Sequence, residues 1–356
     1  MRFMHMADVH LGAAPDRGHE WSGKRESEIW ETFRDALEDA REMNVDLLLI
    51  AGDLFHAPPT EAQLREVDFL FSKLEHTRIV LIAGNHDHLG QGSDWSTFKW
   101  SRNVTFLSST HCECVRFPEI KAEVYGLSYD RQEIPVPLYD DLEPVDDPAS
   151  EGWTKILLAH GGDAMHSPLS RQRMKENGFD YIALGHIHKP MTLVENKALF
   201  CGALEPIDCD DTGAHGYILG ETKGRRIRLS FVKRARRSYR ELTISCTGAD
   251  TTFSVQEALE NAIAAKGTED IYKVTLTGVR EAGRAYDMDR LSRCGLIVSM
   301  EDRTTPALDL EELKRRYHGQ LIGRYIESFE GQEMDMVKMK ALQYGLEALL
   351  ESRVSE

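Results

Sequence analysis

The stretch Ile79-Val80-Leu81-Ile82-Ala83-Gly84-Asn85-His86-Asp87 decides how this chain folds. Its four leading apolar residues, three of them β-branched, indicate a buried strand. Ala83 and Gly84 follow, and a glycine lets the backbone turn sharply. An amide, an imidazole and a carboxylate then stand in a row. A buried strand that stops at such a triplet brings these polar side chains to the rim of a sheet.

Four other apolar runs end in the same way, at an aspartate or a histidine. They are Met4 to Ala7 before Asp8-Val9-His10, Leu47 to Gly52 before Asp53, Ile156 to Ala159 before His160, and Tyr181 to Gly185 before His186-Ile187-His188. We therefore expect five strand ends to converge on one metal site.

The polar groups at these rims predict two metal ions. Hard divalent cations take carboxylate oxygen and imidazole nitrogen. Seven such ligands are too many for one ion with an open position, and they suit two ions about 3.5–4 Å apart that share a carboxylate. Any single one of the 14 histidines is more often a surface or core residue, so the prediction depends on the fivefold recurrence. The expected ligands are Asp8, His10, Asp53, Asn85, His160, His186 and His188.

The composition limits the class of protein. A length of 356 residues favours two or three units. No apolar run reaches about 18 residues, so we expect no membrane span, and the polar first residues are unlike a signal peptide, which predicts a cytoplasmic protein. Six cysteines without a CxxC pair indicate reduced thiols. The net charge of −16 argues against general electrostatic capture of nucleic acid, although two divalent cations would supply local positive charge for a phosphate.

The order of the patterns predicts an α/β core over residues 1–235. Helical spacing marks residues 27–43, 61–76 and 170–177 as helices. The short strands at 123–127, 198–201 and 216–219 predict a second, more antiparallel sheet packed on the first. Residues 236–304 read as a small α+β capping domain. Residues 305–356 carry two amphipathic stripes, one from Leu310 to Tyr325 and one from Met339 to Leu349, which either pack on the body or dock onto a partner's helices.

A basic run interrupts this acidic chain. This run is either a binding site for the backbone of a polyanion or the solvent-exposed face of a strand followed by a linker. Its members are Lys223, Arg225, Arg226, Arg228, Lys233, Arg234, Arg236, Arg237 and Arg240.

The order Asp-x-His, Gly-Asp, Gly-Asn-His-Asp, Ala-His-Gly, Gly-His-x-His resembles the calcineurin-like metallophosphoesterase superfamily, and all five motifs are present. The resemblance implies a four-layer α/β/β/α sandwich and a two-metal centre. One metal would be held by Asp8, His10, Asp53 and His188. The second would be held by Asp53, Asn85, His160 and His186, with Asp53 bridging.

A narrower resemblance is to the SbcD family of DNA repair nucleases, including the YhaO-like exonuclease group. It is carried by Ala7 to Gly12, Gly52 to His56 and Gly185 to Pro190. It implies that His56 contacts the substrate phosphate. It also implies Mn²⁺ as the metal, with Mg²⁺ or Fe as alternatives, DNA as the substrate, and an SbcC-like coiled-coil ATPase and a second copy of this chain as partners.

These features predict a two-metal DNA phosphodiesterase, an exonuclease with endonuclease activity as an open alternative. His86 lies beside the ligands, and because an imidazole titrates near neutrality we expect it to protonate the leaving oxygen or stabilise the transition state. Two other functions compete with this prediction. One is a small-molecule or protein phosphatase of the same superfamily, since one fold supports many chemistries. The other is a non-catalytic scaffold for DNA ends or an ATPase.

Overall fold

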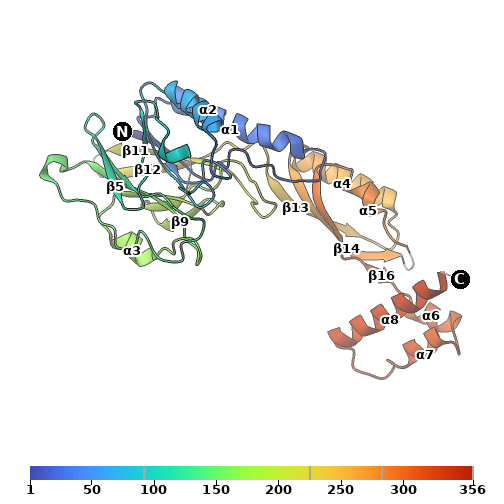
Figure 1. The fold of residues 1–356 in the computed structure, drawn as a ribbon. Coiled ribbons are helices and arrows are strands. Elements are labelled where there is room, and N and C mark those ends of the chain that lie inside the picture. Colours follow the sequence, from blue (N-terminus) through green and yellow to red (C-terminus); the bar gives the residue numbers. More distant parts are fainter. Residues whose placement is uncertain (91–93, 224–225, 282–283, 355–356) are drawn as a thin grey trace. The chain divides into compact units, whose positions relative to one another are not determined.

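A computed structural model of the chain describes residues 1–90, 94–223, 226–281 and 284–354. The chain forms two compact units, Met1–Tyr239 and Arg240–Glu356 (Figure 1). The predicted roles of residues 1–235, 236–304 and 305–356 stay predictions. None of the described helices is long and apolar enough to cross a membrane.

The first unit contains two six-stranded sheets. The first sheet has the order β12-β11-β1-β2-β3-β4 and the second has the order β5-β6-β7-β8-β10-β9. The strands of the first sheet are β1 (Arg2–Met6), β2 (Leu47–Ala51), β3 (Arg78–Ile82), β4 (Val104–Phe106), β11 (Gly216–Lys223) and β12 (Arg226–Lys233). Those of the second are β5 (Glu113–Phe117), β6 (Ala122–Gly126), β7 (Thr154–His160), β8 (Tyr181–Gly185), β9 (Met191–Val194) and β10 (Ala198–Phe200).

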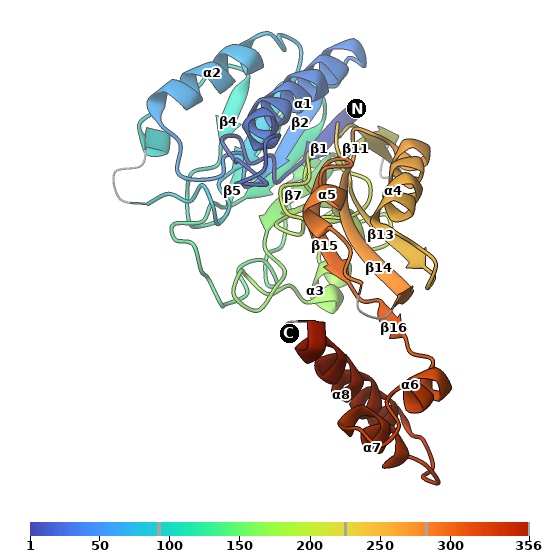
Figure 2. The same cartoon turned by 90° about the vertical axis from the view of Figure 1, so that its right-hand side faces the viewer.

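The two sheets and their helices make the expected layers. Strand β3 is an example of a strand that is covered on both faces. Its residues Ile79 and Leu81 pack in the apolar cluster that α1 (Ser22–Glu42) and α2 (Glu61–Ser72) cover. Its alternate residues Val80 and Ile82 face a second cluster, between the sheets. A strand buried on both faces reads as a continuous apolar run. The two helices lie together on one face of the first sheet (Figure 2).

The outer face of the second sheet is covered by a third apolar cluster. It includes Met174 of the short helix α3 (Arg171–Glu176). Among the described residues of this unit, the remaining helical turns are η1 (Asp94–Ser96) and η2 (Pro148–Ser150). The α/β class and the four-layer arrangement are therefore confirmed.

Two details of the predicted sheets are wrong. The second sheet is not more antiparallel than the first, because β6-β7, β7-β8 and β8-β10 all pair in parallel. The strand expected at 216–219 belongs to the first sheet, where β11 pairs antiparallel with β1. Sequence spacing carries no information about which of two sheets a short strand joins when the pairing partner lies more than 200 residues away.

The second unit contains a four-stranded sheet and five helices among its described residues. Its strands are β13 (Tyr239–Cys246), β14 (Ile271–Glu281), β15 (Ile297–Asp302) and β16 (Thr305–Ala307). Its helices are α4 (Thr252–Lys266), α5 (Met288–Leu291), α6 (Leu310–Arg316), α7 (Leu321–Glu327) and α8 (Met336–Val354). The stripe from Leu310 to Tyr325 is thus two helices, and the break contains Gly319 with φ of 72°.

Part of the basic run is paired within the protein. The Arg234 guanidinium lies 3.0 Å from the Asp39 carboxylate, and that of Arg236 lies 2.6 Å from Asp35. Arg237 and Arg240 also form ion pairs, with Glu28 and Asp270. In the described part of the chain no carboxylate lies within 4.0 Å of the exposed residues Arg226, Arg228 and Lys233 on β12. Arg225 lies outside the described residues.

Candidate metal centre

The seven predicted ligands all lie at the carboxyl ends of five strands, three in the first sheet and two in the second. Asp8 and His10 follow β1, Asp53 follows β2, Asn85 follows β3, His160 ends β7, and His186 and His188 follow β8. Because β1, β2 and β3 are parallel neighbours, as are β7 and β8, their polar ends reach one region. Asp8, His10, Asp53, Asn85 and His160 are buried.

Four of these residues adopt a backbone conformation that non-glycine residues rarely take. Asp8, His10 and Asp53 have φ near 50°, and His186 has φ of 93°. Such left-handed residues cost on the order of 1–3 kcal/mol each, and they gather at functional sites. These conformations turn the backbone sharply at the end of each strand, so that the side chain faces the metal centre formed by the seven predicted ligands.

Two glycines let the strand ends approach closely. A Cβ on Gly84 would lie 2.2 Å from Asp53 Oδ1, and one on Gly52 would lie 2.4 Å from His160 Nδ1. Gly52 also has φ of 88°. Any larger residue at either position would displace Asp53 or His160.

Asp53 lies between two groups of ligands. Its Oδ2 atom is 3.9 Å from His10 Nε2 and 3.4 Å from His160 Nε2. On the first side, His10 Nε2 lies 3.1 Å from His188 Nε2, and one ligand atom from each of Asp8, His10 and His188 lies within 4.8 Å of the others. This arrangement would let one carboxylate contact ions on both sides.

Asn85 is the centre of the second group. Its Oδ1 atom is 2.8 Å from His160 Nε2 and 3.1 Å from His186 Nδ1. The other ring nitrogen of His160 donates to the carbonyl of Ala51 at 2.8 Å, so Nε2 is the atom turned to the centre. Oxygen and imidazole nitrogen converge on both sides of Asp53, and this donor set fits two divalent cations.

The electrostatics of the centre also favour cations. Burial would raise the pKa of Asp53, but the imidazoles of His160 and His10 outweigh burial and hold it well below its usual range. Burial would lower the pKa of His160, yet Asp53 raises it to about 9. Burial raises the pKa of Asp8 to about 6, against the opposing effect of His160 and His188. The Asp53 carboxylate is thus charged and buried, and it needs positive partners.

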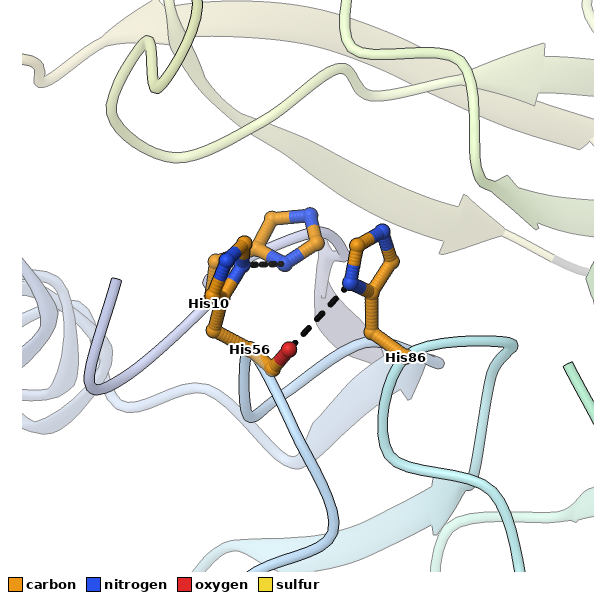
Figure 3. Close-up of side chains that lie close together, drawn as sticks. All are labelled: His10, His56 and His86. Carbon is orange, nitrogen blue, oxygen red and sulfur yellow. Dashed lines mark hydrogen bonds between the residues drawn. The ribbon is translucent and has the colours of Figure 1, made fainter. Parts of the chain in front are cut away.

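The two predicted catalytic histidines lie beside the centre and touch one another (Figure 3). The rings of His56 and His86 stack with centroids 5.1 Å apart. His86 Nδ1 donates to the His56 carbonyl at 3.2 Å, which leaves Nε2 as the ring atom available to a ligand. His56 Nδ1 lies 3.5 Å from Nδ1 of His10, so His56 also contacts the ring of a predicted metal ligand.

Three carboxylates that the sequence did not single out as site residues support the centre. Asp87 accepts the backbone N–H groups of Gly84 and Phe55 at 2.7 and 3.1 Å, and so ties the β3 turn to the β2 turn. Asp163 and Asp211 contact the rings of His186 and His188. Asp87 stands inside the Asn-His-Asp triplet and could have been found there. Asp163 and Asp211 lie in loops, and the sequence around them contains no motif that distinguishes them from other acidic loop residues.

Comparisons with known proteins agree with this geometry. The chain is 26% identical over 302 residues to "Uncharacterized metallophosphoesterase YhaO" of Bacillus subtilis, a match that covers 78% of this chain and 72% of that protein. It is 31% identical over 260 residues to "DNA double-strand break repair protein Mre11" of Methanopyrus kandleri, covering 65% of this chain and 57% of that protein. The protein of the same name from Methanococcus maripaludis is 27% identical over 246 residues, covering 63% and 64%.

The family model of the calcineurin-like phosphoesterases matches residues 1–190. Those residues contain the five strand ends and all seven predicted ligands. Members of this family hydrolyse phosphoesters with two divalent metal ions, and the cluster of histidines and aspartates described above fits such a centre. Because the match spans more than half of the 356 residues, the chain belongs to the calcineurin-like phosphoesterase family.

Proposed function

We propose that this protein is a two-metal phosphodiesterase that cleaves DNA. The observation that carries the proposal is the position of Asp53 Oδ2 between His10 and His160. One ion would be held by Asp8, His10, Asp53 and His188. The other would be held by Asp53, Asn85, His160 and His186. Bound ions of this kind lower the pKa of a water molecule and stabilise the negative charge of a phosphoryl transition state.

The chain's own residues would orient the phosphate and handle the proton. His86 presents Nε2, since its Nδ1 is engaged by the His56 carbonyl. We assign to Nε2 the protonation of the leaving oxygen, a role that general acids perform within about 2.6–3.2 Å of their target. His56 is half-buried and stacks on His86, a position suited to holding a non-bridging phosphate oxygen.

DNA as the substrate is supported by the names of two relatives, which describe DNA double-strand break repair proteins. The chain spans 57% and 64% of the lengths of those proteins. The exposed cations Arg226, Arg228 and Lys233 on β12 could contact a phosphate backbone. Ligands without thiolate disfavour thiophilic ions. The resemblance to the SbcD family makes Mn²⁺ the metal we propose, with Mg²⁺ or Fe as alternatives.

An SbcC-like coiled-coil ATPase is the proposed partner, together with a second copy of this chain. Helices α6, α7 and α8 share a small apolar core that includes Ile322, Ile326 and Leu346. Leu321, Val337 and Met339 remain 66, 77 and 57% exposed on α7 and α8. Amphipathic helices with such exposed apolar residues suit docking onto another helix. Deletion of residues 308–356 should abolish ATPase binding and spare metal-dependent hydrolysis.

The proposed function is tested by digesting end-labelled duplex and single-stranded DNA with Mn²⁺ present, with Asp53→Asn as the inactive control. We expect nucleotide release that EDTA stops. Hydrolysis of p-nitrophenyl phosphate without attack on DNA would identify a phosphatase. DNA binding that survives EDTA, with no hydrolysis in any metal, would identify a scaffold.

A further inference from the structure

Each histidine of the β8 turn has its own carboxylate on the side of the ring that faces away from the centre. His188 turns Nε2 toward His10, and its Nδ1 lies 3.0 Å from Asp211 Oδ2. His186 turns Nδ1 toward Asn85, and its Nε2 lies 2.7 Å from Asp163 Oδ2. The two rings therefore use opposite nitrogens toward the centre.

Asp211 is held firmly in its place. The carboxylate is buried, and its Oδ2 atom also accepts the backbone N–H groups of Ile207 and Asp208 at 3.1 and 3.0 Å. The Asp211 carbonyl is 2.9 Å from Nε2 of the buried His215. A carboxylate that accepts these bonds requires the proton of His188 to be on Nδ1, which leaves the Nε2 lone pair toward the centre.

Asp163 is held by its own turn. Its Oδ1 atom accepts the backbone N–H groups of Met165 and His166 at 2.7 and 2.9 Å. Its Oδ2 atom faces His186 Nε2, and His166 Nδ1 lies 3.0 Å from both carboxylate oxygens. Here the proton of His186 is required on Nε2, and the Nδ1 lone pair faces Asn85.

We propose that Asp211 and Asp163 are positioning residues that each fix the tautomer and ring orientation of one metal-binding histidine. Asp211 then sets the affinity of the ion held with His10, and Asp163 sets that of the ion held with Asn85. The inference rests on the ligand assignment in the proposed function. Carboxylates behind ligating histidines raise ligand basicity, and their removal weakens metal binding by about 10–100-fold.

Calorimetric titration of the metal-free protein, residues 1–356, with Mn²⁺ tests the proposal. We expect two ions to bind the unchanged protein. Asp211→Asn should weaken one of them by about 10–100-fold, Asp163→Asn should weaken the other, and the double variant should weaken both. Asp141→Asn makes the same charge change on an exposed residue and should leave both affinities unchanged.

The tautomers give a readout that a merely structural role would not move. Long-range ¹⁵N–¹H spectra of the metal-free protein should show His188 protonated at Nδ1 and His186 at Nε2, and each should change only in its own variant. Unchanged Mn²⁺ affinities with unchanged tautomers would overturn the proposal, as would both variants weakening the same ion. If Asp211→Asn fails to fold, the exposed Asp163 decides alone. A wild-type protein that binds no divalent ion would refute the proposed function itself.

Discussion

His10 Nε2 lies 3.1 Å from His188 Nε2, although the two histidines follow strands of different sheets. Without a cation, one of these nitrogens must carry a proton to bond the other, whereas a divalent cation can accept the lone pairs of both. Mn²⁺ should therefore stabilise the fold, by about 2.7 kcal/mol for each ion at a concentration 100 times its Kd. Thermal unfolding with EDTA or with excess Mn²⁺ measures the gain. The gain should shrink in Asp53→Asn, and an equal gain in that variant would contradict the shared carboxylate.

Gly84 is one of the two glycines named above at which the metal centre tolerates no side chain. The Cβ of an alanine would lie 2.2 Å from Asp53 Oδ1 and 2.7 Å from the Asp53 backbone nitrogen. Gly84→Ala should therefore push Asp53 out of the centre and weaken Mn²⁺ binding at least 10-fold in calorimetry. Gly23→Ala is the matched control, because Gly23 lies in α1 and has open space where the Cβ would be. Equal Mn²⁺ affinities in the two variants would show that Asp53 can move without cost.

The turn at Gly84 and the contact of His10 with His188 show how much of the fold and of the site can be predicted from the sequence. An apolar run that ends in Gly-Asn-His-Asp predicts both a buried strand and the polar rim, since strand, turn and ligand follow one another locally. All five strand ends were found in this way. The association of β11 with β1 is not local, and neither is the contact of Asp211 with His188, 23 residues earlier. An aspartate in an acidic loop looks the same in sequence whether it supports a ligand or faces solvent.

His86 should matter for hydrolysis and little for metal binding. Its backbone N–H donates to Asp53 Oδ1 at 2.9 Å, and a substitution keeps that group, while its ring meets the predicted ligand His10 only edge to face, with centroids 4.8 Å apart, in the described part of the chain. His86→Ala should lower kcat on DNA by about 100-fold or more, as loss of a general acid predicts. Titration with Mn²⁺ should show unchanged affinities. A variant with full kcat and both ions bound would exclude His86 as the acid.

His5 makes the folded state sensitive to acid. It is buried and lies 2.9 Å from the Tyr181 hydroxyl, and burial lowers its pKa from 6.5 to about 3. Between these two values the unfolded chain binds a proton that the folded chain does not, so stability falls as the pH falls from 6.5 toward 3. The slope for one proton is about 1.4 kcal/mol per pH unit.

The variant His5→Asn isolates this contribution. Asparagine keeps a polar group near Nδ1 for Tyr181 but does not titrate. Urea unfolding in EDTA at pH 7 and pH 5 should show a smaller loss of stability in the variant than in the unchanged protein. Other acid-sensitive groups are common to both proteins and cancel in the comparison. Identical losses would mean that His5 is protonated in the folded state.

Arg25 holds the start of α1 within a buried group of charges. Its side chain is 1% exposed, and its guanidinium lies 2.8 Å from Glu28, 3.6 Å from Glu205 and 3.7 Å from Asp16. It also donates to the carbonyl of Pro206 at 2.6 Å. Removing one partner of a buried ionic group leaves charges uncompensated, so Arg25→Met should lower the free energy of unfolding by about 3–5 kcal/mol.

An exposed ion pair between α1 and α2 provides the comparison. Arg34 lies 2.8 Å from Glu66, and both side chains are nearly half exposed. Such pairs contribute about 0–1 kcal/mol, so Arg34→Met should be nearly neutral. Urea unfolding of both variants at pH 7 measures the difference. A small loss in both would mean that Glu28, Glu205 and Asp16 find other partners, of which Arg237, already paired with Glu28, is the nearest candidate.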